Sequence, residues 1–158
     1  MRREFKKILY SEMSKNNRIR IICPDLGFGF FDEIKHDFSD RFIQCQATEN
    51  LALGIATGMT LDGFITIVYS IVPFLISTPH SFLRNYLNHE KIPVKLLGIG
   101  RGNDYSKTDQ FSHFCGDDKK IMKCFSNIKC YWPKLNNLEI TTQEWLYNLS
   151  PSYMNLRK

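Results

Sequence analysis

Short apolar segments alternate with helix-like segments along the whole chain, and this alternation constrains the fold more than any other feature. Strands are expected in six short apolar runs, at residues 19–23, 42–45, 64–69, 94–99, 128–132 and 152–156. The run at 64–69 is almost continuously apolar, as expected for a parallel strand that is buried on both faces. Strands that alternate with helices favour a parallel sheet covered on both sides. The sequence therefore predicts a three-layer α/β/α sandwich with a mostly parallel six-stranded sheet.

The segments between these strands carry helical patterns. Helices are expected at residues 2–13, 30–38, 49–61, 79–89, 117–125 and 141–149. Thr141 or Thr142 is expected to cap the last helix, and residues 70–76 are expected to form a loop after the central strand. No linker, repeat or low-complexity segment interrupts the pattern, so we expect a single domain over residues 1–158.

The composition narrows the class of protein. The chain has 158 residues and a net charge of +5, but its basic residues are scattered and form no basic face interleaved with aromatic residues, so nucleic acid is not an expected partner. The longest apolar run, residues 64–76, is too short to span a bilayer, and we expect no membrane association. The five cysteines form no C-x-x-C pair, so a reduced cytoplasmic setting without a zinc site is expected.

Glu49 is the leading candidate for a functional residue. It follows the strand at 42–45 and opens the small-residue helix at 49–61. Ligands bind at the carboxyl ends of strands in open parallel sheets, so a carboxylate at this point faces a ligand site. The alternative is an ordinary glutamate in a first helical turn that complements the helix dipole, worth less than about 1 kcal/mol.

Two further residues each allow two interpretations. His113 lies in the loop after the strand at 94–99 and is either a surface histidine or a hydrogen-bonding group for a substrate. Phe74 is either a core residue or a platform for a flat heteroaromatic ring. The glycines of residues 98–102 suggest a phosphate loop, but the G-x-G-x-x-G spacing is not met and no Walker lysine follows.

Several spaced motifs, taken in order, carry a family resemblance. They are DLGFG at 25–29, FDE at 31–33, DRFI at 40–43, EN at 49–50, GIATGM at 54–59, VYSIVPF at 68–74, LRN at 83–85, PVKLLG at 93–98, SH at 112–113, DD at 117–118 and PSY at 151–153. Together they resemble the pyrimidine-binding domain of transketolase-like, thiamine-diphosphate-dependent enzymes. The resemblance covers almost the whole chain and implies that the cofactor lies between this domain and a second one.

The resemblance assigns cofactor contacts to four residues of the chain. Glu49 matches the glutamate that hydrogen-bonds the N1′ atom of the aminopyrimidine ring and favours its imino tautomer, which makes it a catalytic residue. Phe74 matches the aromatic residue that stacks on this ring. Tyr69 and Ile71 are the alternatives for the same wall.

The same resemblance implies how a sugar substrate is recognised. His113 matches a histidine that touches the substrate, and Asp25 and Asp109 are the further substrate candidates. Full transketolases have a serine that helps bind the sugar phosphate, and this chain has Gly29 near the corresponding position. A phosphorylated substrate is therefore not implied, although Arg157 or Lys158 could supply basic groups.

The resemblance also implies a partner. The G-D-G motif that holds the metal and the diphosphate in the second domain is absent, because Gly116-Asp117-Asp118 lacks the second glycine. We therefore expect a split enzyme in which a separate diphosphate-binding subunit, the transketolase N-terminal section, holds Mg²⁺. An α2β2 assembly is expected, and whether a third chain joins stays open.

The expected activity is transfer of a two-carbon ketol unit from a sugar or ketose, and specialised sugar biosynthesis is one setting for it. A subunit of a 2-oxoacid decarboxylase is the alternative within the same class, and His113 favours transfer. A non-catalytic relative that only binds a partner is the alternative of another class, and the retention of Glu49 argues against it.

Overall fold

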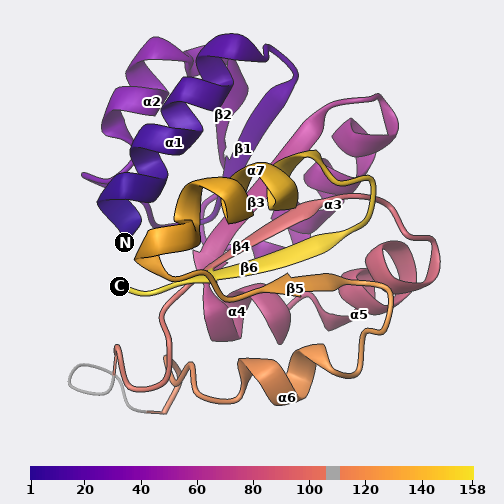
Figure 1. The fold of residues 1–158 in the computed structure, drawn as a ribbon. Coiled ribbons are helices and arrows are strands. Elements are labelled where there is room, and N and C mark those ends of the chain that lie inside the picture. Colours follow the sequence, from indigo (N-terminus) through magenta and orange to yellow (C-terminus); the bar gives the residue numbers. More distant parts are fainter. Residues whose placement is uncertain (106–110) are drawn as a thin grey trace.

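The chain forms one parallel sheet with helices on both faces (Figure 1). The structure is a computed structural model and describes residues 1–105 and 111–158. The six strands are β1 (Ile19–Cys23), β2 (Phe42–Gln44), β3 (Ile65–Ile71), β4 (Lys95–Ile99), β5 (Lys129–Tyr131) and β6 (Ser152–Leu156). They lie in the order β2-β1-β3-β4-β6-β5, and every neighbouring pair is parallel. The predicted three-layer α/β/α fold is confirmed.

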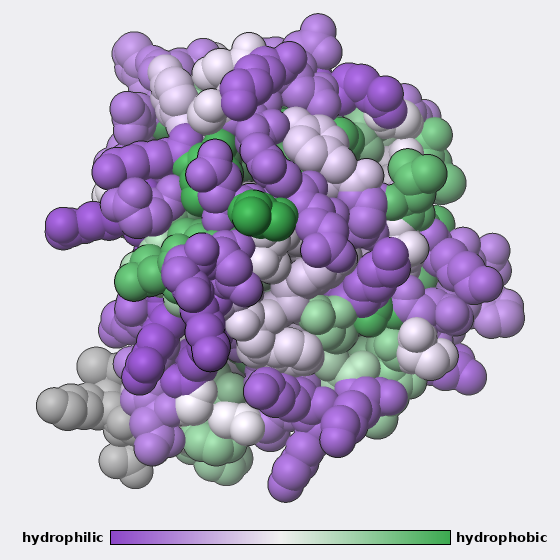
Figure 2. Space-filling model, viewed as in Figure 1, coloured by the Kyte–Doolittle hydropathy of each residue, from purple (hydrophilic) through white to green (hydrophobic). Residues whose placement is uncertain are grey.

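One face of the sheet is covered by α1 (Arg2–Lys15), α2 (Asp32–Asp37) and α7 (Leu138–Tyr147). Phe5 of α1 meets Trp145 of α7 edge-on, with ring centroids 6.2 Å apart, and both side chains are fully buried. Each large apolar side chain buried in this way stabilises the fold by about 1.5–3 kcal/mol. The outer side of this layer is mostly hydrophilic (Figure 2), as expected for amphipathic helices that bury one stripe.

The opposite face carries α3 (Glu49–Leu61), α4 (Val72–Ile76), α5 (His80–Phe82), a π-helix over Leu83–His89, and α6 (Asp118–Met122). Ala52 and Ala56 of α3 share a buried cluster with Val68 of β3. Since alanine is small, α3 lies close over the centre of the sheet, and its first turn reaches the carboxyl end of β3.

The two faces of β3 are both buried, and successive side chains alternate between them. Ile67 and Tyr69 belong to the cluster under α1 and α7, whereas Val68 belongs to the cluster under α3. Ser70 points toward α3 as well, because its hydroxyl contacts Glu49. The alternation therefore decides which β3 residues can reach a site at the start of α3.

The predicted bounds of β1, α3 and β6 match the structure, and the other elements differ from their predicted bounds by up to three residues. The helix expected at 79–89 is divided into α5 and the π-helix, and residues 70–71, expected in a loop, belong to β3. Residues 72–76 form the short helix α4 rather than a loop, with Pro73 in its first turn, where a missing N–H costs nothing. The last helix begins at Leu138, so the expected cap at Thr141 or Thr142 is wrong. Thr142 is buried inside the helix instead, and its hydroxyl donates to the Leu138 carbonyl at 2.7 Å.

Across residues 1–105 and 111–158, no helix is both long enough and apolar enough to cross a membrane.

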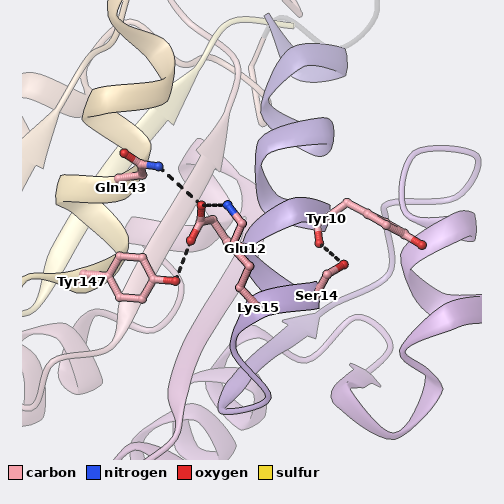
Figure 3. Close-up of polar contacts among 6 residues, drawn as sticks. All are labelled: Tyr10, Glu12, Ser14, Lys15, Gln143 and Tyr147. Atoms are coloured by element: carbon pink, nitrogen blue, oxygen red, sulfur yellow. Dashed lines mark hydrogen bonds and ion pairs between the residues drawn. The ribbon is translucent and has the colours of Figure 1, made fainter.

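A buried carboxylate joins α1 to α7 (Figure 3). Glu12 accepts hydrogen bonds from the Tyr147 hydroxyl at 2.7 Å, the Lys15 ammonium at 3.2 Å and the Gln143 amide at 3.4 Å. The Tyr147 bond is the main cause of a lowered Glu12 pKa. These bonds connect residues at opposite ends of the sequence and hold α7 over the sheet.

We predict that Glu12→Gln lowers the free energy of unfolding by about 1 kcal/mol at pH 7, the difference between hydrogen bonds to a charged and to a neutral acceptor. A carboxyl group whose pKa is lowered on folding stabilises the fold above its ordinary pKa, here 4.5, and that contribution is lost as the pH falls through the lowered value. The difference between wild type and variant should therefore shrink below pH 4.5 in urea-unfolding curves.

Glu4→Gln is the matched control, because Glu4 pairs with Lys7 on the exposed side of the same helix. Its effect should stay below about 1 kcal/mol at every pH. Equal losses in the two variants would contradict the role assigned to Glu12.

Candidate functional site

A cavity of about 260 Å³ opens at the carboxyl ends of the central strands. The chain runs from β1 outward to β2 and then back to β3 on the other side of β1, so the strand order reverses between β1 and β3. In open parallel sheets, ligands bind at this reversal point. The cavity lies there, and its walls are formed by Asp25, Leu26, Ala47, Glu49, Ser70, Ile71, Phe74 and His113.

Glu49 reaches the cavity because of a tight connection between β2 and α3. Gln46 adopts a left-handed backbone conformation (φ 57°), and the Thr48 hydroxyl donates to the Cys45 carbonyl. This turn starts α3 at Glu49 and directs its half-buried carboxylate at β3, where the Ser70 hydroxyl lies 3.4 Å from Oε1. The position also suits the helix dipole, so the two interpretations of Glu49 are compatible.

Phe74 and Ile71 contribute apolar side chains to the cavity wall. α4 begins directly after β3, and this change of direction carries Phe74 from the sheet to the mouth of the cavity. Its ring meets the His113 ring edge-on, with centroids 5.0 Å apart. Phe74 is half-buried, so a flat ring could still contact it.

His113 completes the cavity from the connection that follows β4. Its Nδ1 atom lies 2.9 Å from the Ser112 hydroxyl, and its ring centroid lies 6.0 Å from that of Tyr105. The side chain is half-buried. The structure therefore brings Glu49, Phe74 and His113 to one cavity, although 64 residues separate Glu49 from His113 in the sequence.

Asp25 enters the cavity from the turn after β1, where several hydrogen bonds fix the backbone. Gln44 of β2 donates to the Pro24 carbonyl and, at 3.3 Å, to that of Cys23. The Cys23 thiol donates to the Leu26 carbonyl at 3.1 Å, and burial raises the pKa of this thiol to about 12. Cys23 is therefore a structural thiol that shapes the turn carrying Asp25.

Tyr69 takes no part in this cavity. Its side chain is fully buried in the layer of α1 and α7, where its ring meets Phe31 edge-on with centroids 4.9 Å apart. Of the residues expected at the pyrimidine wall, only Phe74 and Ile71 line the cavity. Asp109 lies outside the described residues.

Ser70 is the residue that sequence reasoning missed. It is 1% exposed, and its hydroxyl contacts the Glu49 carboxylate. The available signal was a serine near the carboxyl end of a largely apolar strand, ITIVYSI. Leu26 and Ala47 also line the cavity and carried no sequence signal of their own.

Exposed apolar side chains stand on the connections at the same edge of the sheet. Phe28 follows β1, Leu51 lies in the first turn of α3, and Phe114 follows His113, with exposures of 70%, 54% and 46%. Each follows a cavity-lining residue by one or two positions in the sequence, so a chain that covered the cavity would also cover them.

The cavity suits a flat, nitrogen-containing aromatic ring. A carboxylate at one end can accept a hydrogen bond from a ring nitrogen or share its proton, and the Phe74 and Ile71 side chains offer apolar contact to the ring face. These are the contacts that an aminopyrimidine needs. In the described ranges, no group of three or more His, Cys, Asp or Glu side chains is placed to hold a metal ion.

The chain resembles known proteins in sequence. Residues 1–137 match the family described as "Transketolase, pyrimidine binding domain". The chain is 29% identical over 101 residues to one subunit of the apulose-4-phosphate transketolase of Actinobacillus succinogenes, an alignment that covers 64% of this chain and 32% of that protein. It is 22% identical over 129 residues to an uncharacterized 33.6 kDa protein in the fasciation locus of Rhodococcoides fascians, covering 82% of this chain and 41% of that protein. The chain thus spans well under half the length of these curated relatives.

Solved structures share the fold at low sequence identity. A split-gene transketolase, described as an inactive β4 tetramer, superposes with a TM-score of 0.82 at 20% identity and covers 97% of this chain and 49% of that one. A transketolase mutant from Pichia stipitis gives a TM-score of 0.83 at 15% identity, over 99% of this chain and 25% of that one. The sequence match extends over residues 1–137, and the chain therefore belongs to the transketolase pyrimidine-binding domain family.

Proposed function

We propose that this chain binds the aminopyrimidine of thiamine diphosphate and supplies the glutamate that activates it, in a transketolase-like enzyme whose diphosphate half comes from another polypeptide. The observation that carries the proposal is the position of Glu49. Its carboxylate lies at the strand reversal point, within reach of Ser70, and lines the same cavity as Phe74.

Each wall of the cavity has a task in this proposal. Glu49 would share a proton with the N1′ atom of the ring: its carboxyl group would donate to the neutral ring and accept from N1′–H once the proton has moved, while the Ser70 hydroxyl would orient the carboxylate. Phe74 and Ile71 contact the face of the ring. His113 and Asp25 line the same cavity and are the groups that would meet a substrate. When bound, the cofactor supplies a thiazolium ring that stabilises a carbanion.

The size of the cavity supports a shared site. Pockets that bury a drug-sized ligand have volumes of about 300–1,000 Å³, whereas this one measures about 260 Å³ and is large enough for one ring. Phe28, Leu51 and Phe114 flank it with exposed apolar side chains. A second chain that covers these residues would complete the site and bring the diphosphate and Mg²⁺ ligands. A relative named as one subunit of a transketolase and a neighbour named as a split-gene transketolase support a separate partner subunit. We propose two copies of each subunit, an α2β2 assembly.

The proposed reaction is transfer of a two-carbon ketol unit between sugars. The observation that favours it over decarboxylation of a 2-oxoacid is the placement of His113 at the cavity, where a polyhydroxylated substrate needs hydrogen-bonding groups. The name of the relative from Actinobacillus succinogenes includes a sugar phosphate. Gly29 offers no side chain for such a phosphate, so we propose only the ketol transfer.

We predict that Glu49→Gln and Glu49→Ala lower turnover of the complex by several orders of magnitude, because the hydrogen bond to the ring nitrogen positions and activates the cofactor. The measurement is a calorimetric titration of thiamine diphosphate with magnesium into this chain alone and into the chain co-expressed with its partner, followed by turnover of the complex. Binding is expected for the pair alone and should be lost in the Glu49→Ala pair.

Glu139→Gln is the matched control, since Glu139 is also an acidic residue in a first helical turn but lies in α7. It should leave binding and turnover unchanged. Normal turnover in Glu49→Gln would refute the proposal. Absence of binding in every sample would favour the non-catalytic, partner-binding alternative.

We also predict that Phe74→Ala weakens cofactor binding to the complex by roughly tenfold, because stacking on an aromatic ring contributes about 0.5–1.5 kcal/mol beyond the buried area. Tyr69→Phe is the comparison variant, because the Tyr69 side chain lies in the other layer and should not affect binding. The same titration measures both, and weaker binding in Tyr69→Phe alone would contradict the assignment of the ring platform to Phe74.

A further inference from the structure

Asp118 is a buried carboxylate outside the cavity with an unusual number of hydrogen-bond partners. Its side chain is 6% exposed. One oxygen, Oδ2, accepts hydrogen bonds from three side chains, the Asn155 amide at 2.7 Å, the Trp132 indole at 2.8 Å and the Tyr153 hydroxyl at 3.1 Å. The other oxygen accepts from the Lys119 backbone N–H at 2.8 Å. Four donors offset the cost of burying this carboxylate.

Two of the three side-chain donors come from a buried strand of the sheet, and the third directly follows its neighbour. Tyr153 and Asn155 lie in β6, between β4 and β5, and are 0% and 1% exposed, while Trp132 directly follows β5. Burial and the adjacent Asp118 charge raise the pKa of Tyr153, so its hydroxyl stays protonated and remains a donor. Asp118 therefore fastens the start of α6 to the sheet.

The segment between His113 and Asp118 is short, and Cys115 holds it at a second point. Cys115 is fully buried, forms an isolated antiparallel bridge with Gly102, and its thiol donates to the His113 carbonyl at 3.2 Å. His113 precedes Asp118 by five residues. α6 also contacts α4, the helix that carries Phe74. The ring of His113 thus lies on a short segment whose far end is fixed by Asp118.

We propose that Asp118 is a positioning residue that holds His113 against Phe74 at the wall of the cavity. Asp118 does not line the cavity, so it acts through the backbone of residues 113–118. The catalytic meaning of this role rests on the proposed function, since only there does His113 meet a substrate. The geometry itself requires neither cofactor nor partner, so the two can fail separately.

The test uses the full chain with Asp118→Asn. Asparagine keeps the size of the side chain, but it removes the charge and replaces one acceptor oxygen with an N–H₂ donor that faces other donors. The readout is the set of histidine ring signals in proton–carbon NMR spectra, which is simple because the chain has four histidines. His113→Gln assigns the His113 signal, and Phe74→Leu gives its position without the neighbouring ring.

In wild type, the edge-on contact with Phe74 should displace the His113 signal from its position in Phe74→Leu. Asp118→Asn should abolish this displacement while the signals of His36, His80 and His89 stay in place. A folded Asp118→Asn chain whose His113 signal remains at the wild-type position would overturn the proposal. Asp117→Asn, which removes the same charge one residue earlier, should leave all four signals unchanged.

Trp132→Phe is the second variant, for the case in which Asp118→Asn does not fold. It removes one donor from outside the strands and leaves the carboxylate in place. It should move the His113 signal part of the way toward the Phe74→Leu position, and an unmoved signal would count against the proposal. Failure of wild-type chain and partner to bind thiamine diphosphate would refute the proposed function and leave this result standing.

Discussion

The parallel pairing of β1 with β3 is the constraint on which the rest of the molecule depends. Ile19 to Ile22 of β1 lie opposite Ile65 to Val68 of β3, and both strands are almost fully buried by helices on each face. Because β2 lies on the far side of β1, this pairing creates the point where the strand order reverses. The cavity lies at that reversal, and α3 and α4 both begin beside it.

Each polar residue of the cavity is positioned by a different set of contacts. Glu49 is placed by a left-handed turn and the hydroxyl of a buried strand residue, Ser70. Asp25 is placed by hydrogen bonds from β2, and His113 by a segment fixed at Asp118. Consequently, no single element carries the whole site.

Much of this fold was predictable from the sequence, because the turn residues and the ends of the apolar runs indicate the same element boundaries. The bounds of β1, α3 and β6 follow from that agreement. α4 was missed because VPFLI is apolar throughout, and a short apolar run cannot be assigned to a helix or a loop by its period.

The side of the sheet to which each β3 side chain points could not be predicted from the sequence either. Both faces of this strand are buried, so its pattern does not reveal that Ser70 points to the site while Tyr69 points away. Glu49, Phe74, Ile71, Asp25 and His113 line one cavity, and their roles toward a cofactor or substrate stay predictions that rest on the resemblance. The contribution of Ser70 and the anchoring by Asp118 depend on contacts between residues far apart in the sequence and needed coordinates.

The wide sequence separation of the cavity-wall residues also determines when the site can form during folding. Its residues run from Asp25 to His113, and they meet only after β1 has paired with both β2 and β3. Pairing two parallel strands closes a long loop, and the chain entropy is lost before the contacts between the strands form. Such pairings therefore form slowly. A partly folded chain therefore exposes apolar helices before it has any half-site to offer. Recognition by a partner that reads this cavity would then select for chains that have finished folding.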